Sequence, residues 1–305
     1  MFNYSFISDK KTILSTDHEK TSLMLEFPNI SPVAIAIGPD TVLSVFGWFS
    51  IKLPLLIRWY SLAYIAGILG GWWYAGRMNR RAQFMNEKQF DAILSWIVIG
   101  IVAGGRLGYV IFYNAAYFIH HPLEIFYVWQ GGMSFHGGMI GTILSIYIFC
   151  RRNKLEFFRI MDVAACVSPI GLGLGRLANF INGELYGRAT DSPLGMIFPN
   201  SDGLPRHPSQ LYEAGLEGFL FLIILSLLFW KYDKWKKPAF LSGVFLICYA
   251  IFRIIIECFR EPDAQLGFFF QYITMGQLLC IPMILLGVYL LYRAGKYAKP
   301  VTRNN

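Results

Sequence analysis

The chain has 305 residues, of which 55% are hydrophobic and only 15% are charged. A soluble domain of this length needs a polar shell with about 25% charged residues, so the composition excludes an ordinary soluble protein. The formal net charge of +8 lies mainly in four short clusters, which is typical of a membrane orientation signal and not of a nucleic-acid-binding surface.

The N-terminal part of the chain contains no uninterrupted apolar segment. Residues 1–26 are polar and mixed in charge, without the basic-then-apolar order of a signal peptide, and are expected to form a disordered tail. Residues 27–58 are more apolar, but Gly38, Pro39 and Asp40 interrupt them, as do Lys52 and Pro54. We therefore expect a periplasmic or interfacial arm, or a short re-entrant piece, over this range.

The rest of the chain is a series of apolar segments, each long enough to cross a bilayer, which takes about 20 residues. Seven such segments are predicted: 59–76, 92–114, 133–150, 160–181, 211–230, 239–258 and 271–292. No soluble block separates them. The sequence therefore predicts an all-α integral membrane protein with one seven-helix domain over 59–293 and a basic tail at 294–305.

Basic residues predict the orientation of these segments. They cluster after the first, third, fifth and seventh segments, for example at Arg80 and Arg81, Arg151 and Arg152, Lys236 and Lys237, and Arg293 and Lys296. The loop at 115–132 contains neither Lys nor Arg. Because short cytoplasmic loops carry the excess of Lys and Arg, the N-terminus is predicted to be periplasmic and the C-terminus cytoplasmic.

The five cysteines lie in or at the ends of apolar segments, and none of them forms a C-x-x-C pair: Cys150, Cys166, Cys248, Cys258 and Cys280. We interpret them as small buried apolar residues and not as disulfide partners or metal ligands. No metal site is predicted.

Several polar and ionisable side chains fall within the predicted segments, where they are costly and usually functional. The predicted orientation gathers them near the outer leaflet: Tyr60, Arg106, His136, Arg176, Tyr249, Arg253 and Glu257. Tyr249, Arg253 and Glu257 of the sixth segment recur with Arg260 at helical spacing. The four side chains therefore share one helix face. Arginines with a histidine in apolar surroundings suit a phosphate or another anionic head group. Alternatively, Arg253 and Glu257 merely neutralise each other across one helical turn.

Two glycine-rich motifs surround candidate site residues. The segment GGMSFHGGMIG (131–141) lets backbone or lipid approach His136, whose imidazole is suited to take a proton near neutral pH. Glycine-mediated helix packing is an equally good interpretation of this motif. The segment GLGRLANFINGELYGR (173–188) places Arg176 and Asn179 on one helix face and ends in a polar loop with Glu184. A structural cap is the alternative for this loop.

In these two motifs, the sequence resembles the prolipoprotein diacylglyceryl transferase family. RHPSQLYE (206–213), YAIFRIIIECFREPDAQ (249–265) and QYITMGQ (271–277) also resemble the family, and the resemblance covers about residues 27–293. It implies seven membrane helices in the bacterial inner membrane, with the active site toward the periplasmic leaflet. It also implies transfer of the diacylglyceryl group from phosphatidylglycerol to the lipobox cysteine of a prolipoprotein signal peptide, the first step of lipoprotein maturation. A thioether forms and glycerol phosphate leaves, without a cofactor and without a nucleic-acid partner.

The resemblance also implies roles for individual residues. Arg176 and Arg253 fall on the family's essential arginines, and with His136 they are predicted to be catalytic. Phosphatidylglycerol is predicted to contact Arg176 together with Tyr60, Arg106, Asn179, Glu184, Tyr249, Glu257 and Arg260. Ala178 departs from the family pattern, which often has glycine there.

A mechanism follows as a hypothesis. His136 would act as the base for the substrate thiol, or position it, while Arg176 and Arg253 hold the phosphate and Glu257 orients an arginine. Alternatively, an arginine-rich site could lower the pKa of the thiol enough to make a base unnecessary. The rival function is a membrane transporter or receptor for an anionic lipid or solute. It is disfavoured because the inner halves of the segments are apolar and no internal repeat is visible.

Overall fold

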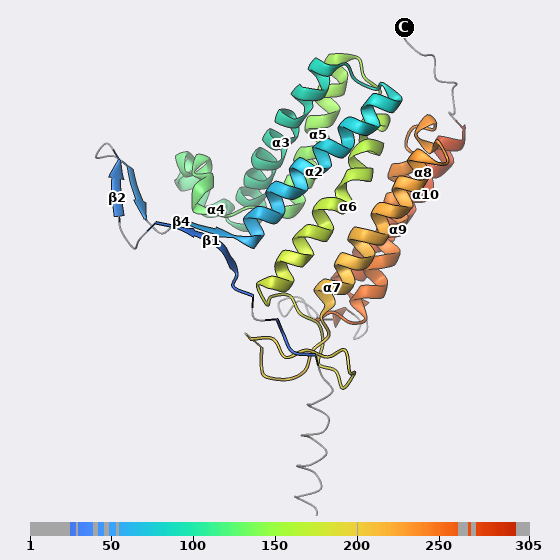
Figure 1. Cartoon of the computed structure of the whole chain (residues 1–305). Helices are drawn as coiled ribbons and strands as arrows, with labels where there is room; N and C mark the ends of the chain where they lie inside the picture. The colour runs from blue at the N-terminus through green and yellow to red at the C-terminus, as the bar shows by residue number, and fades with distance from the viewer. Residues whose placement is uncertain are drawn as a thin grey trace, which may run out of the picture. The chain divides into compact units, whose positions relative to one another are not determined.

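The computed structural model describes residues 25–28, 30–38, 42–45, 49–52, 55–199, 201–261, 268–269 and 273–296. The described chain is mostly helical, as predicted (Figure 1). Nearly all of the predicted tail at 1–26, residues 297–305 of the predicted basic tail, and Asp40 lie outside the described residues.

Long helices coincide with the segments predicted to cross the membrane. They are α2 (Trp59–Ala82), α3 (Glu87–Tyr113), α5 (Phe135–Asn153), α6 (Phe157–Ile181), the continuous run α7 (Ser209–Glu213), η3 (Ala214–Leu220) and α8 (Phe221–Trp230), α9 (Phe240–Glu257) and α10 (Met275–Lys296). Among the described residues, five of these are long and apolar enough to cross a membrane: α3, α6, the run Ser209–Trp230, α9 and α10. The chain is thus a helical membrane protein, whereas the count of seven spans stays a prediction.

The helices α3 and α5 begin where the sequence supplies side-chain caps. Before α3, the Asn86 side chain accepts a hydrogen bond from the Gln89 amide at 2.9 Å, and the Gln89 side chain accepts one from the Asn86 amide at 3.1 Å. This reciprocal pair satisfies two amides that the first turn leaves without helical partners. Before α5, the Ser134 hydroxyl oxygen accepts a single hydrogen bond from the Gly137 amide at 3.2 Å.

The predicted arm at 27–58 contains strands. Strand β1 (Val33–Ile37) pairs antiparallel with β4 (Leu55–Arg58), which leads directly into α2, and β2 (Val42–Val45) pairs antiparallel with β3 (Phe49–Lys52) (Figure 1). A further two-residue pair joins β5 (Phe268–Phe269) to β6 (Ile273–Thr274). The loop at 115–132 holds α4 (Ala115–His120) and two 3-10 turns, η1 (Pro122–Phe126) and η2 (Val128–Gln130).

The chain divides into two compact units. Unit 1 comprises Met1–Ile68, Pro169–Phe221 and Cys248–Met283, and unit 2 comprises Leu69–Ser168, Leu222–Ile247 and Ile284–Asn305. The divisions fall inside helices, namely α2, α6, α8, α9 and α10.

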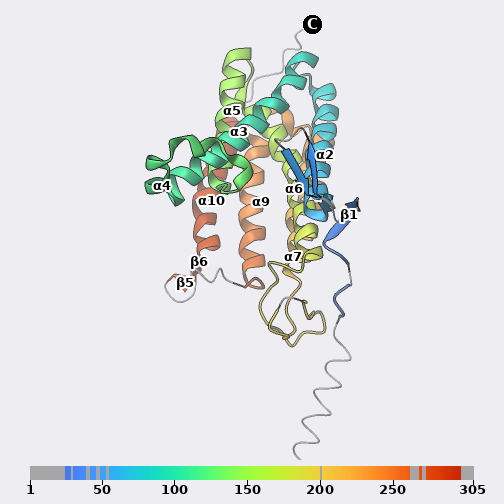
Figure 2. The same ribbon diagram turned by 90° about the vertical axis from the view of Figure 1, so that its left-hand side faces the viewer.

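In unit 2, α3 and α5 lie side by side through a stripe of small residues (Figure 2). A Cβ added to Gly104 would lie 2.7 Å from the Gly141 Cα, and one added to Gly108 would lie 2.7 Å from the Gly137 Cα. No side chain fits at these positions, because the two backbones touch. The packing interpretation of the 131–141 motif therefore accounts for Gly137 and Gly141.

A buried carboxylate fixes the start of α9 in unit 2. Asp162 of α6 is 2% exposed and accepts hydrogen bonds from the amides of Ala239 and Ser242, at 2.9 and 2.7 Å. The Ser242 hydroxyl donates a third bond at 2.6 Å. A carboxylate at this position satisfies first-turn amides and complements the positive end of the helix.

Candidate functional site

Unit 1 contains most of the predicted site residues. They are Tyr60, Arg176, Asn179, Glu184, Tyr249, Arg253, Glu257 and Arg260. Arg106 and His136 belong to unit 2.

The two arginines predicted to be catalytic each pair with a buried glutamate. Arg176 of α6 forms an ion pair with Glu213 at the end of α7, whose side chain is 1% exposed. In α9, the Arg253 Nη2 lies 2.9 Å from the Glu257 Oε2, one helical turn away. The mutual neutralisation of Arg253 and Glu257 that the sequence left open is thus observed.

A glycine of α10 packs against the ion pair in α9. A Cβ added to Gly276 would lie 3.0 Å from the Glu257 Oε2 and 3.2 Å from the Arg253 Nε. The side chain of any larger residue at this position would crowd both charged groups. The glycine at this position therefore keeps room for the ion pair, and it lies within the QYITMGQ motif.

A second glutamate, Glu217, follows Glu213 in the π-helical segment η3. Its side chain is fully buried, and neither of its oxygens has a hydrogen-bond partner among the described residues. Its charge interacts with those of four neighbours: Glu213, Arg176, Arg253 and Arg260. Glu217 therefore lies within the same group of charges, which we call the arginine cluster: Arg176, Arg253, Arg260, Glu213, Glu217 and Glu257.

Sequence reasoning missed Glu213 and Glu217. Both were available to it, since they lie inside the predicted segment 211–230, where an ionisable residue is a functional candidate by default. The π-helical winding around Glu217 is itself a feature that often marks functional sites.

Close backbone contact holds η3 against α6. A Cβ added to Gly218 would lie 2.5 Å from the Gly173 Cα, and one added to Gly173 would lie 3.1 Å from the Gly218 Cα. Gly173 precedes Arg176 by about one helical turn, and Gly218 follows Glu217 directly. The two glycines thus bring the chain segments that carry the cluster into contact.

The end of α6 and the polar loop after it form a second part of the site. The Asn179 Nδ2 donates to the Glu184 Oε1 at 2.8 Å, and the Gln210 Nε2 donates to the Glu184 carbonyl at 2.7 Å. The Tyr60 phenol lies 3.3 Å from the Tyr64 hydroxyl and interacts electrostatically with Glu184 and Arg176. Asn179 and Glu184 are thus joined to each other, and Tyr60 lies within electrostatic range of both Glu184 and Arg176.

The loop at 182–208 is attached to the end of α9 by Arg188. Its amide donates to the Phe259 carbonyl at 2.9 Å, and its Nε donates to the Arg260 carbonyl at 2.8 Å. The Nη2 reaches the Glu257 carbonyl at 3.2 Å. This loop therefore fixes the chain end that follows the Arg253–Glu257 pair.

Ion pairs at Arg206 hold the same loop. Its Nη2 lies 2.8 Å from the Asp202 carboxylate, and its Nη1 lies 2.7 Å from the Glu261 carboxylate. The hydrogen bonds from Arg206 lower the pKa of Asp202 to about 2. Burial lowers the pKa of the neighbouring His207 below its ordinary value.

In unit 2, Arg106 is 5% exposed and its guanidinium binds backbone carbonyls. Its Nε donates to Ile125 at 2.8 Å, its Nη1 to Gly131 at 2.6 Å and its Nη2 to Glu124 at 2.6 Å. These contacts anchor the loop at 115–132. Binding of phosphatidylglycerol by Arg106 stays a prediction. His136 lies in the first turn of α5 with an exposed side chain.

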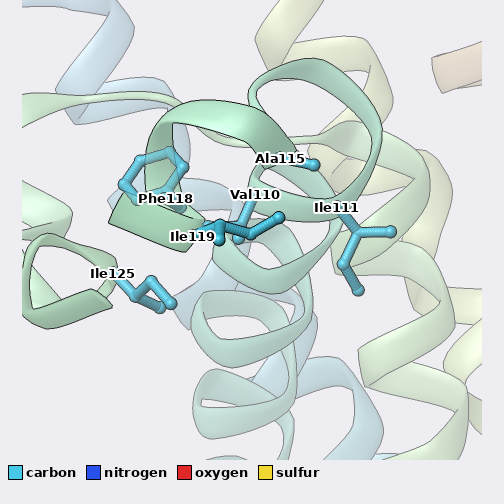
Figure 3. A pocket seen from close by; sticks show the side chains of 6 residues that line it. All are labelled: Val110, Ile111, Ala115, Phe118, Ile119 and Ile125. Carbon is cyan, nitrogen blue, oxygen red and sulfur yellow. The ribbon is translucent and has the colours of Figure 1, made fainter. Parts of the chain in front are cut away.

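An apolar pocket lies beside this loop in unit 2. Its volume is about 250 Å³, and the side chains that line it come from the end of α3, from α4 and from η1: Val110, Ile111, Ala115, Phe118, Ile119 and Ile125 (Figure 3). The lining carries no ionisable group, so the pocket itself offers no acid or base for chemistry. The described residues contain no group of three or more His, Cys, Asp or Glu side chains that could hold a metal ion.

Comparison with known proteins gives consistent matches. The family model described as prolipoprotein diacylglyceryl transferase matches residues 47–293. Three similar proteins carry the name phosphatidylglycerol–prolipoprotein diacylglyceryl transferase. That of Rickettsia felis is 49% identical over 268 residues, covering 88% of this chain and 98% of the relative. That of Rhodospirillum rubrum is 50% identical over 281 residues, covering 91% and 96%. That of Rickettsia bellii is 48% identical over 270 residues, covering 88% and 97%.

Proposed function

Because the chain belongs to the prolipoprotein diacylglyceryl transferase family, we propose that it transfers the diacylglyceryl group of phosphatidylglycerol to the lipobox cysteine of prolipoproteins. This assignment replaces the transporter or receptor alternative. The geometric observation that carries the proposal is the arginine cluster of unit 1, where Arg176 and Arg253 come from different helices and each holds a buried carboxylate.

The two arginines are suited to bind the lipid phosphate. A guanidinium stays charged in apolar surroundings and offers five N–H donors, so pairing with one carboxylate does not exhaust it. Arg176 uses its Nε toward Glu213, and Arg253 uses an Nη toward Glu257. We assign the phosphate to these two guanidinium groups. Asn179, Glu184, Tyr60, Tyr249 and Arg260 would contact the rest of the head group.

The reaction requires a nucleophilic sulfur and a stabilised leaving group. The cysteine sulfur of the prolipoprotein attacks the glycerol carbon that bears the phosphate, a C–S bond forms, and the C–O bond breaks. Glycerol phosphate leaves with the bonding electron pair, and the thiol proton passes to a base or to the leaving phosphate. Arg176 and Arg253 would stabilise the charge that develops on the leaving oxygen. His136 is our candidate for the base or for the residue that positions the thiol.

We further propose that seven helices cross the bacterial inner membrane, with the N-terminus in the periplasm and the cluster toward the periplasmic leaflet. Basic residues in the last turns of α2, α5 and α10 support this orientation: Arg80, Arg81, Arg151, Arg152, Arg293 and Lys296. Positive residues at these ends favour the cytoplasmic side.

The direct test incubates the purified protein with phosphatidylglycerol and a lipobox peptide. The expected result is a peptide mass gain equal to one diacylglyceryl group. Arg176→Ala and Arg253→Ala should each lower the transfer rate by about 100-fold or more, since each removes charge stabilisation from the leaving group. The measurement is mass spectrometry of the peptide over time.

Arg81→Ala is the matched control. Arg81 is half-exposed in unit 2 and pairs with Asp233 at 2.7 Å, outside the arginine cluster, so its removal should leave transfer intact. An unmodified peptide with the unsubstituted protein would contradict the function. Near-normal transfer in a folded Arg176 or Arg253 variant would remove that residue from the phosphate site.

A further inference from the structure

Glu217 differs from the other two glutamates of the arginine cluster. Glu213 pairs with Arg176, and Glu257 pairs with Arg253. Glu217 forms no ion pair within the described residues, and neither of its oxygens accepts a hydrogen bond there, although its side chain is fully buried. A buried carboxylate without a partner is costly, and the neutral acid is the cheaper form in such a place.

The surroundings of Glu217 push its ionisation in opposite directions. Burial without a hydrogen-bond partner favours the protonated acid, whereas the positive charges of the arginine cluster favour the carboxylate. The titratable groups that face it come from four elements: Glu213 of α7, Arg176 of α6, Tyr249, Arg253 and Arg260 on and after α9, and Cys280 of α10. The equilibrium between protonated and ionised Glu217 therefore depends on how strongly the arginine charges act on its carboxylate.

An anion bound among these arginines changes that balance. A phosphodiester at Arg176 and Arg253 draws on the positive charge that stabilises the Glu217 carboxylate, and it adds a negative charge to the same apolar region. Both effects favour the protonated form. Glu213 and Glu257 each form an ion pair with an arginine, which favours their carboxylate form. Glu217 has no such pair among the described residues, so it is the carboxylate best placed to accept the proton.

We infer that Glu217 takes up a proton when phosphatidylglycerol binds, so that its protonation state sets the affinity of the cluster for an anionic lipid. The inference rests on the proposed function, which puts the phosphate at Arg176 and Arg253. It deepens that function by giving a role to a residue outside the predicted site. Linkage is reciprocal: lipid promotes protonation, and protonation promotes lipid binding.

The sign of the pH dependence follows. At low pH Glu217 is already protonated and the lipid binds at full affinity. As the pH rises through the titration of Glu217 in the lipid-free protein, each binding event must recruit a proton. The affinity then falls by up to about tenfold per pH unit, until Glu217 is ionised in the lipid-bound protein as well.

The experiment is calorimetric titration of the purified full chain with short-chain phosphatidylglycerol between about pH 5 and pH 9. Heats measured in two buffers of different ionisation enthalpy give the number of protons taken up per lipid. The expected result is an uptake approaching one proton in the unsubstituted protein. Glu217→Gln, which mimics the neutral acid, should take up none and should bind with an affinity that does not depend on pH.

Two further variants separate Glu217 from other groups. Glu156→Gln replaces a half-exposed glutamate that pairs with Arg159 at 2.6 Å in unit 2, and it should keep the wild-type proton uptake. His136→Gln tests the histidine that we propose as the base. If proton uptake disappears in the His136 variant instead, Glu217 is not the acceptor and the inference is overturned.

A measurement on the unsubstituted protein alone can also overturn the inference. The test therefore stays decisive even if the Glu217→Gln variant does not fold. Zero proton uptake across the whole pH range would overturn the inference, as would equal uptake in a folded Glu217→Gln variant. Failure of the proposed function is a different result, namely a peptide that gains no diacylglyceryl mass.

Discussion

Three buried or partly buried arginines, Arg106, Arg176 and Arg253, differ in the groups that surround their guanidinium. Arg106 is surrounded by backbone carbonyls of one loop, whereas Arg176 and Arg253 each face a glutamate. Carbonyls of a fixed loop cannot take up a proton. A carboxylate can, and Glu217 is the carboxylate of the arginine cluster that we infer to do so. All three residues are arginines in the sequence, so only the structure distinguishes Arg106, which anchors a loop, from Arg176 and Arg253.

Asp162 leads to a prediction about stability. Replacing it by alanine removes three hydrogen bonds and leaves the buried amides of Ala239 and Ser242 without partners. We expect Asp162→Ala to lower the free energy of unfolding by about 2–4 kcal/mol. The measurement is the thermal unfolding of the purified protein in detergent.

The control for this prediction is Asp91→Ala, because Asp91 is an exposed residue of α3. Its melting temperature should stay close to that of the unsubstituted protein. Equal melting temperatures for the Asp162 and Asp91 variants would show that the Asp162 carboxylate does not stabilise the start of α9.

At the scale of elements, the contact between α6 and η3 controls how Arg176 meets Glu213. Gly218→Ala puts a Cβ about 2.5 Å from the Gly173 Cα, so the two segments must move apart. We expect this variant to lose both melting temperature and transfer activity, because the segments that carry Arg176 and Glu217 separate. Transfer assays and thermal unfolding on the same preparation provide the check.

Gly215→Ala is the matched substitution in the same π-helical segment. A Cβ added to Gly215 meets nothing within 4 Å, so this change should be neutral or stabilising by up to about 1 kcal/mol. Two equally impaired variants would point to a general intolerance of η3 to alanine, and the backbone contact would then not be the cause.

The long helices could be predicted from the sequence because their length and apolar character are local properties. The segment predicted at 92–114 is the helix Glu87–Tyr113, and the one at 160–181 is Phe157–Ile181. The pairing of β1 with β4 could not be predicted in this way. It joins residues on both sides of the interruption at Gly38–Asp40, and strand pairing depends on partners that a single segment does not reveal.

At the scale of the whole molecule, the candidate site was predicted in part. The face of Tyr249, Arg253 and Glu257 follows from helical spacing, and its ion pair is observed. The roles of Glu213 and Glu217 depend on the π-helical winding of η3 and on the approach of α6, which are tertiary features. The local sequence shows both carboxylates, but it does not show the partners that distinguish Glu213 from Glu217.

The proposed orientation predicts which loops face the periplasm. In a variant that lacks all five cysteines, Asp191→Cys should react with a membrane-impermeant maleimide in intact spheroplasts, and Lys237→Cys should react only after permeabilisation. Both positions are exposed in the structure. The cysteine-free background should retain transfer activity, because the reacting thiol comes from the substrate. The readout is gel mobility of the labelled protein.

Labelling of both positions from the same side would contradict the proposed arrangement of spans. Complete loss of transfer in a folded cysteine-free protein would contradict a substrate-supplied nucleophile. The two results are independent, since the first concerns topology and the second concerns chemistry.

The wide turns of η3 affect how mutational data on this span should be read. An ordinary helical wheel advances about 100° per residue, but a π-helical stretch closes its hydrogen bonds one residue later. A wheel drawn continuously from Ser209 to Trp230 therefore slips out of phase across Ala214–Leu220. A scan that plots sensitivity on one wheel would assign lipid-facing and interior positions wrongly after the slip, so the residues on its two sides need separate wheels.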